Sequence, residues 1–139
     1  LEFRLCSSDL RGFAATASDY ETDALEAVRY NADRNAAAAV TTRLLDWRSL
    51  PDDLGTFDRV VAADVLYEKH HAEALAAVIT RTLAPTGSAL VADPGRAKAA
   101  QFEPAIRRHG LGVVKRPPRR PLGMTEGPEI DIYCVTFPA

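Results

Sequence analysis

The chain has 139 residues, of which 47% are hydrophobic and 26% are charged, with a formal net charge of -2 at pH 7. This length predicts one domain over residues 1–139, and the composition is that of an ordinary soluble protein. The small net charge argues against a nucleic-acid-binding surface, and no apolar run reaches the roughly 18 residues of a membrane span. Cys6 and Cys134 lack metal or redox spacing, which favours a reducing cytoplasm.

The first half of the chain alternates strand and helix patterns. The apolar residues 14–18 predict a strand. Residues 22–35 carry an amphipathic stripe and predict a helix, with Thr22 as its N-cap. Residues 40–45 and 57–63 predict two more strands. This alternation is typical of a parallel sheet.

A second amphipathic helix and a fourth strand come next. Residues 72–83 predict the helix, which Pro85 and Gly87 are expected to close. The apolar residues 88–92 then predict the strand, and Asp93 follows it directly.

The carboxyl-terminal part changes character. A third helix is expected over residues 97–109, in which Pro104 should kink the helix or delay its start. Residues 111–115 and 129–137 predict two strands without a helix between them, which favours antiparallel pairing. The basic residues 115–120 are interpreted as a solvated loop. The expected fold class is therefore α/β, a mostly parallel sheet with helices on both faces and an antiparallel hairpin at one edge.

Acidic residues follow three of the predicted strands. Asp19, Asp46 and Asp64 each come at the end of an apolar run. Ligands bind outside the carboxyl ends of the strands in open α/β sheets. We therefore expect a small-molecule site at this edge of the sheet.

Two of these acids suit a nucleoside. A carboxylate at Asp19 can accept hydrogen bonds from a ribose diol, although a loop acid or a cap of the next helix explains it equally well. Trp47 offers a flat apolar face for a purine and Asp46 an acceptor for its amine. The alternative is that Trp47 covers a sheet edge.

The segment Asp64-x-x-Tyr67 suits an amine nucleophile. A carboxylate and a phenol can both hold an amine by hydrogen bonds, whereas the alternative is a capping acid and a packed ring. The adjacent His70 and His71 are expected to be solvated, and no metal site is predicted. The turn Asp93-Pro94-Gly95-Arg96 either lines the substrate entrance or serves only as a turn.

Taken together, these residues resemble the class I S-adenosylmethionine-dependent methyltransferases. The similarity is greatest to the seven-β-strand protein-lysine methyltransferases and their bacterial relatives, and it spans about residues 14–96. The segment 57–67, which contains Asp-x-x-Tyr, is its most specific part, and residues 89–96 resemble a bacterial branch of the family. The resemblance implies a Rossmann-like fold.

The resemblance also implies roles for particular side chains. It places Asp64 and Tyr67 against the substrate amine as catalytic residues. The cofactor, S-adenosyl-L-methionine, would be bound by Asp19, Tyr20, Asp46, Trp47 and Ala63.

The amino-terminal segment departs from this pattern. Such enzymes have a first strand and a glycine-rich turn, but residues 1–13 contain one glycine and no Gly-x-Gly. If residues 1–6 form a strand, about seven residues remain before the next one, and a parallel crossover needs about a dozen. We expect a missing or degenerate first strand and favour a truncated or frame-shifted gene as the reason.

The function expected from these features is methyl transfer from S-adenosylmethionine to the amine of a protein lysine, without nucleic-acid or membrane partners. Two alternatives stay open: a cofactor-incompetent methyltransferase-like domain that binds a partner, and a small-molecule N-methyltransferase. A nicotinamide-dependent enzyme is disfavoured because no Gly-x-Gly-x-x-Gly precedes Asp19. The sequence leaves the oligomeric state open.

Overall fold

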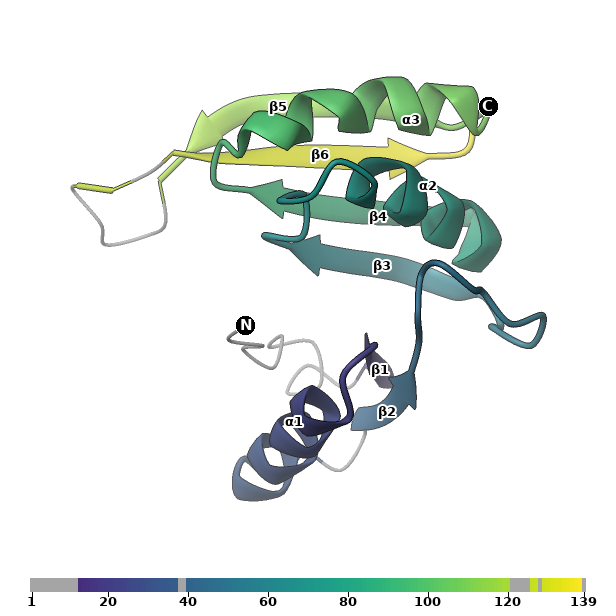
Figure 1. Cartoon of the computed structure of the whole chain (residues 1–139), viewed down its shortest axis with the longest axis vertical. Helices are drawn as coiled ribbons and strands as arrows, with labels where there is room; N and C mark the ends of the chain where they lie inside the picture. Colours follow the sequence, from purple (N-terminus) through teal and green to yellow (C-terminus); the bar gives the residue numbers. More distant parts are fainter. Residues whose placement is uncertain (1–12, 38–39, 121–125, 128, 139) are drawn as a thin grey trace. The chain divides into compact units, whose positions relative to one another are not determined.

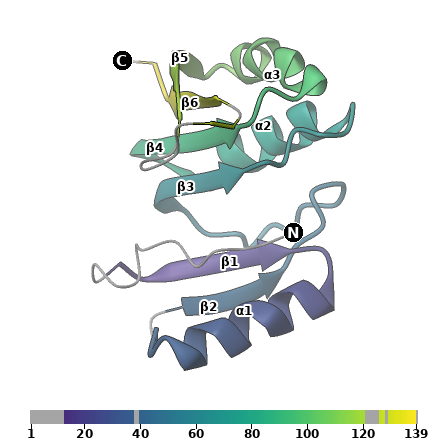
Figure 2. The ribbon, with the colours of Figure 1, turned by 90° about the vertical axis from the view of Figure 1, so that its left-hand side faces the viewer.

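The computed structural model describes residues 13–37, 40–120, 126–127 and 129–138, and the chain divides into two compact units (Figures 1 and 2). The N-terminal unit is Leu1–Leu50 and the C-terminal unit is Pro51–Ala139. The prediction of one domain stays a prediction. The expected loss of the first strand and glycine-rich turn concerns residues 1–12, which lie outside the described part.

The N-terminal unit is a β-α-β element. Strand β1 (Ala15–Asp19) pairs in parallel with β2 (Val40–Leu44), and helix α1 (Thr22–Arg34) connects them. The helix buries Leu25, Val28 and Ala32, which recur at helical spacing along one face. The two predicted strands and the helix between them are therefore confirmed.

The predicted N-cap is wrong by one residue. Helix α1 begins at Thr22 itself, and the extended residue before it, Glu21, is the N-cap. Glu21 caps without a side-chain hydrogen bond, but its backbone N–H donates to Oδ1 of Asp19 over 2.9 Å. The chain enters the helix through this turn. The side chain of Asp19, and not that of Thr22, therefore fixes the backbone just before the helix.

The C-terminal unit is a four-stranded mixed sheet in the order β3-β4-β6-β5. Strands β3 and β4 are parallel, whereas β6 is antiparallel to both β4 and β5, as the arrow directions in Figure 1 show. The α/β class and the carboxyl-terminal antiparallel pair are therefore confirmed. The bounds of the elements are β3 (Phe57–Ala63), α2 (His71–Thr82), β4 (Leu83–Asp93), a 3-10 turn η2 (Ala97–Gln101), α3 (Phe102–Arg108), β5 (Gly112–Arg119) and β6 (Ile130–Thr136).

The core of this unit lies between the sheet and helices α2 and α3, which share one face of the sheet (Figure 2). Phe102 of α3 is fully buried, and its ring meets the edge of Tyr133 of β6 at a centroid distance of 5.3 Å. Val91 lies opposite Tyr133 in the ladder and is also fully buried. On the other face, Val61 is 57% and Val114 is 66% exposed, so burial is one-sided within this unit.

Pro104 delays the third helix, as predicted. Residues Ala97–Gln101 form a 3-10 turn, and the α-helix starts only at Phe102. Pro104 then falls in the first helical turn, where its missing N–H would have no intrahelical partner. The helix ends before Gly110, whose φ of +78° lies in the left-handed region that favours glycine.

The expected end of helix α2 needs correction. Leu83 already belongs to β4, because it pairs with Phe57, and β4 continues through Pro85 and Gly87 instead of starting at residue 88. A register irregularity between Phe57 and Arg59 accommodates the proline. A Cβ at Gly87 would lie 2.9 Å from the carbonyl oxygen of Asp58. This glycine therefore allows two strands to approach closely and does not end a helix.

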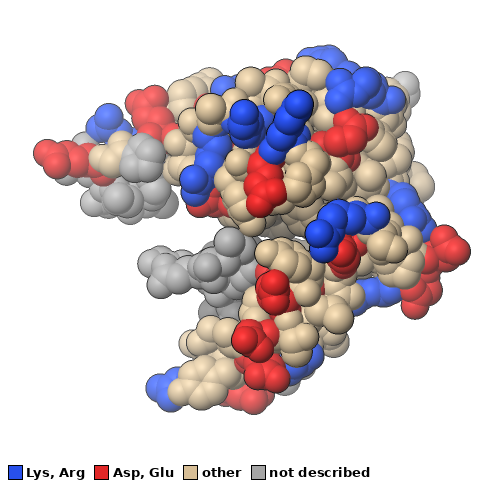
Figure 3. All heavy atoms as spheres, in the orientation of Figure 1, with Lys and Arg blue, Asp and Glu red and all other residues tan. Residues whose placement is uncertain are grey.

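The basic cluster also differs from the expected loop. Residues Lys115 to Arg119 belong to β5. Among the described strands β5 lies at the edge of its sheet, where prolines are tolerated because one side of the backbone makes no ladder hydrogen bonds. Lys115 pairs with Asp131 of β6 over 2.8 Å. On the face of the C-terminal unit that Figure 3 shows, acidic and basic side chains are interspersed. Among the described residues, no helix has the length and apolar character needed to cross a membrane.

Replacing Phe102 with alanine should lower the free energy of unfolding by about 3–5 kcal/mol, because the ring is fully buried between α3 and β6. Urea unfolding followed by circular dichroism measures this loss. Val114→Ala is the matched control, since this side chain is 66% exposed, and its effect should stay within about 0.5 kcal/mol. Equal losses in the two variants would contradict the described core.

Candidate functional site

In the N-terminal unit, the predicted cofactor residues share one edge of the two-stranded sheet. Asp19 ends β1, and its carbonyl oxygen accepts a hydrogen bond from the N–H of Leu45, which follows β2. Asp46 and the half-buried Trp47 come next along the chain. The parallel pairing therefore brings Asp19 to the same edge as Asp46 and Trp47, as the sequence predicted.

The carboxylate of Asp19 is oriented by the turn before α1. Its Oδ1 accepts the N–H of Glu21, and the residue is only partly exposed. A carboxylate keeps further lone pairs when it accepts one hydrogen bond, so this geometry is compatible with a diol ligand. Tyr20, which is 59% exposed, lies beside it in the turn.

The carboxylate of Asp46 is bound by Arg48, a partner that the sequence did not predict. The Arg48 guanidinium holds both carboxylate oxygens, with Nη2 2.7 Å from Oδ2 and Nε 2.9 Å from Oδ1. The backbone N–H of Arg48 also donates to Oδ1 over 2.9 Å. The side-chain hydrogen bonds from Arg48 lower the pKa of Asp46 from 3.8 to about 2. A purine amine would have to share this carboxylate with Arg48.

In the C-terminal unit, Asp64 leaves the end of β3 in an unusual backbone conformation. Its φ is +55°, a left-handed value that aspartate tolerates better than most residues. Its N–H donates to the carbonyl oxygen of Ala92 on the parallel strand β4 over 2.9 Å. The preceding Ala63 is exposed. The end of the β3–β4 ladder thus fixes the backbone that presents Asp64.

The side chain of Asp64 is bound by Arg96. Nε of Arg96 lies 2.5 Å from Oδ1, and Nη2 lies 2.7 Å from Oδ2, which is the fork geometry of an arginine–carboxylate pair. The side chain of Asp64 is 49% exposed and that of Arg96 is 44% exposed, so solvent reaches both. The hydrogen bonds from Arg96 are the main reason that the pKa of Asp64 lies below its usual value.

Asp93 anchors the turn that carries Arg96. It is fully buried at the end of β4, and its Oδ1 accepts the N–H groups of Gly95, over 2.9 Å, and Arg96, over 2.7 Å. Gly95 has a φ of +87°, so the tight turn requires a residue without a Cβ. Oδ2 of Asp93 is buried and has no hydrogen-bond partner among the described residues. The buried carboxylate of Asp93 therefore fixes the turn Asp93–Arg96 at the edge of the sheet.

Tyr67 lies beyond Asp64 and is 39% exposed. Its ring meets the edge of the His71 ring at a centroid distance of 4.6 Å. Nδ1 of His71 lies 2.8 Å from the carbonyl oxygen of Val65, so His71 is held at the start of α2. The expectation that His71 is solvated is therefore wrong. His70 is exposed, as expected, and its Nδ1 lies 3.5 Å from Glu68. The atoms of Glu68, His70 and His71 that could bind a metal ion lie within 4.8 Å of one another.

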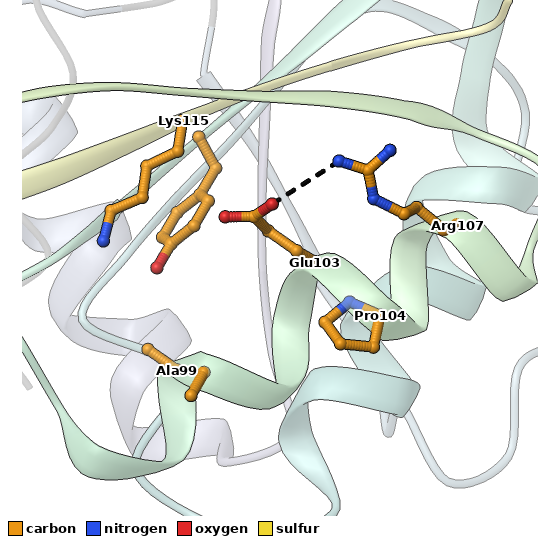
Figure 4. A pocket seen from close by; sticks show the side chains of 7 residues that line it. Ala99, Glu103, Pro104, Arg107 and Lys115 are labelled. Carbon is orange, nitrogen blue, oxygen red and sulfur yellow. Dashed lines mark ion pairs between the residues drawn. The ribbon is translucent and has the colours of Figure 1, made fainter.

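A pocket of about 510 Å³ lies on the helix-covered side of the C-terminal unit (Figure 4). Its charged groups are already paired: Glu103 with Arg107 at 3.6 Å, and Lys115 with Asp131 at 2.8 Å. None of the predicted site residues lines it, so it does not mark the expected site. Its lining residues are Ala99, Ala100, Glu103, Pro104, Arg107, Lys115 and Tyr133.

The structure thus groups the predicted residues in two sets, with one set in each unit. Asp19, Asp46 and their neighbours lie at the edge of the N-terminal unit, and Asp64 and Tyr67 at the edge of the C-terminal unit. Arg48 and Arg96 were not predicted as carboxylate partners. The short spacing from Asp46 to Arg48 signals the first pair, but the second joins two residues that are 32 positions apart in the chain.

Comparison with known proteins shows the family to which the chain belongs. The family described as lysine methyltransferase matches residues 6–103, which include Asp19, Asp46, Asp64 and Tyr67. The chain belongs to this lysine methyltransferase family. A curated relative, the protein-lysine N-methyltransferase rrg1 of Schizosaccharomyces pombe, is 32% identical over 87 residues. This match covers 53% of the chain and 29% of rrg1, so the chain spans less than a third of that relative.

Solved structures confirm the fold of this lysine methyltransferase family member. The glycopeptide N-methyltransferase MtfA in complex with S-adenosyl-L-homocysteine has a TM-score of 0.76 at 16% identity, over 96% of this chain and 78% of MtfA. The ribosomal protein L11 methylase of Lactobacillus delbrueckii subsp. bulgaricus has a TM-score of 0.63 at 19% identity, over 88% and 58% of the two chains. These likenesses confirm the Rossmann-like architecture expected from the sequence.

The Asp46–Arg48 pair should be visible in a carboxyl ¹³C NMR titration. Asp46 should titrate near its pKa of about 2, and Arg48→Gln should move the midpoint back toward 3.8. Because folding lowers this pKa, the stabilisation is complete above pH 3.8 and is lost as the pH falls through about 2. Arg34→Gln is the control, since Arg34 contacts Tyr30. An unchanged midpoint in Arg48→Gln would refute the pair.

Proposed function

We propose that this chain is an S-adenosyl-L-methionine-dependent N-methyltransferase that acts on the amine of a protein lysine. The observation that carries the proposal is the half-exposed carboxylate of Asp64, which the end of the β3–β4 ladder presents three residues before the partly exposed Tyr67. Membership of the lysine methyltransferase family and the similarity to rrg1, a protein-lysine N-methyltransferase, support this choice of substrate.

The residues of the N-terminal unit are assigned to the cofactor. Asp19 fits a ribose diol, because the turn to Glu21 fixes its carboxylate while lone pairs remain for a ligand. Trp47 supplies an apolar face at the same edge for the adenine, and Tyr20 lies beside Asp19. Asp46 fits less simply, because Arg48 occupies both of its oxygens, so its contact with the purine amine requires a shared carboxylate. In the C-terminal unit, the exposed Ala63 would lie against the cofactor.

The residues of the C-terminal unit are assigned to the substrate amine. S-adenosyl-L-methionine would supply a methyl group on a sulfonium. The amine nitrogen would form the N–C bond as the S–C bond breaks, the cofactor would leave as a neutral thioether, and the methylated ammonium would release a proton. Asp64 would accept a hydrogen bond from the amine, and Tyr67 would hold it from a second direction, which fixes the attacking lone pair. Both side chains would position the nucleophile.

Calorimetric titration of the 139-residue chain with S-adenosyl-L-homocysteine tests the cofactor assignment. Micromolar binding would support it. The matching activity assay follows transfer of a labelled methyl group to poly-L-lysine, with n-butylamine as the small-molecule acceptor. Transfer to n-butylamine alone would favour a small-molecule N-methyltransferase. A folded chain that binds no cofactor would refute the proposed enzyme and leave a methyltransferase-like binding domain.

Asp19→Ala should weaken S-adenosyl-L-homocysteine binding by about 1.5–3 kcal/mol, the scale of hydrogen bonds to a charged group. This loss corresponds to a roughly 10- to 150-fold rise in Kd by calorimetry. Asp33→Ala serves as the matched control, because Asp33 is exposed on α1 in the same unit. If both variants bind alike, Asp19 does not hold the ribose.

Tyr67→Phe should lower turnover roughly 3- to 10-fold, the scale of one neutral hydrogen bond, and leave Kd for the cofactor unchanged. The phenyl ring retains the contact with His71, so the packing at the start of α2 is kept. Tyr30→Phe is the control, since Tyr30 is 61% exposed on α1. A variant with normal turnover but weakened cofactor binding would place Tyr67 in the cofactor pocket instead.

A further inference from the structure

The carboxylate assigned to the substrate amine already has a cationic partner. Arg96 binds both oxygens of Asp64 at 2.5 and 2.7 Å. A carboxylate has about four lone-pair sites, and the guanidinium fork uses two of them. Because Asp64 is 49% exposed, a further donor can still reach it from solvent. An incoming amine would therefore meet a neutral ion pair and not a bare negative charge.

This difference matters for amine chemistry. A lysine amine has an ordinary pKa near 10.4 and enters as an ammonium, which has no lone pair with which to attack a methyl group. A bare carboxylate stabilises the ammonium and makes deprotonation harder, whereas a neighbouring cation favours the free base. A neutralised Asp64 would still accept one N–H of a free amine without trapping the charged form.

The position of Arg96 is built into the fold. The buried carboxylate of Asp93 accepts the backbone N–H groups of Gly95 and Arg96, which fixes the turn. Asp93 and Asp64 come at the ends of the two parallel strands β4 and β3, and the ladder brings the two turns together. In the described part of the chain, Asp93 and Tyr67 also act electrostatically on Arg96.

We propose that Arg96 is a positioning residue that neutralises Asp64, so that a substrate amine is held beside Asp64 and Tyr67 as the free base and not as the ammonium. This inference rests on the proposed function for its biological meaning. Its physical content is the charge selectivity of the Asp64 site, which is measurable without cofactor or methyl transfer. Asp93 acts one step further away, by fixing the backbone of Arg96.

Two small probes with the same four-carbon chain test this selectivity. The ligand n-butylamine, charged at pH 7, mimics the lysine side chain, and n-butanol is its uncharged counterpart. NMR titrations would follow the resonances of Asp64 and Tyr67 in the full chain. In the unmodified protein, n-butanol should bind at least as tightly as n-butylammonium. A clear preference for the ammonium in the unmodified protein would overturn the proposal, whatever any variant does.

Arg96→Gln should tighten n-butylammonium binding at pH 7 by about tenfold and leave n-butanol binding unchanged, because removal of one adjacent cation shifts an ionisation by about one unit at a half-exposed site. Arg96→Lys keeps the charge and should behave like the unmodified protein. Arg107→Gln, which removes an exposed ion pair with Glu103 on α3, is the matched control.

The outcomes separate this inference from the proposed function. A folded Arg96→Gln protein with unchanged ammonium binding would overturn the role of Arg96, even if the chain transfers methyl groups. Tightened ammonium binding in a chain without methyl transfer would support the charge selectivity and refute the enzyme. If Arg96→Gln loosens binding of both probes, Arg96 is only structural, and the proposal fails.

Discussion

The parallel pairing of β3 with β4 is the constraint on which the position of the Asp64–Arg96 pair depends. It aligns the carboxyl ends of two strands, and the last hydrogen bond, from Asp64 N–H to the Ala92 carbonyl oxygen, holds Asp64 in a left-handed conformation. The next residue of β4, Asp93, is buried and fixes the turn that carries Arg96. One ladder therefore sets the backbone of both partners of the Asp64–Arg96 pair.

The same pattern occurs in the N-terminal unit, with a different local solution. Parallel strands β1 and β2 bring Asp19 and Asp46 to one edge. Asp19 is held by a backbone N–H and retains accepting capacity, whereas Asp46 is held by the guanidinium of Arg48. In both units an acid follows a strand, and in both an arginine nearby in space has neutralised one of these acids. The chemistry of each carboxylate depends on that partner as much as on its position at the sheet edge.

The chain belongs to the lysine methyltransferase family and has a Rossmann-like fold. Catalysis by methyl transfer requires little from the protein beyond orientation of the amine and control of its charge. The Asp64–Arg96 pair is suited to both tasks, because the fork fixes the carboxylate in place and cancels its charge. A site of this kind would recognise an amine by hydrogen bonds to its nitrogen and not by attraction to its positive charge.

The sequence by itself determined the elements with strong periodicity and the acids that follow them. The strand at residues 57–63, the stripe of α1 and the effect of Pro104 on the start of α3 were predictable, because each depends on local patterns or on proline chemistry. The course of β4 through Pro85 and the pairing of Arg96 with Asp64 were not, because both require a partner distant in the chain. Local sequence fixes which backbone a residue prefers, but only the tertiary structure decides which charge stands beside it.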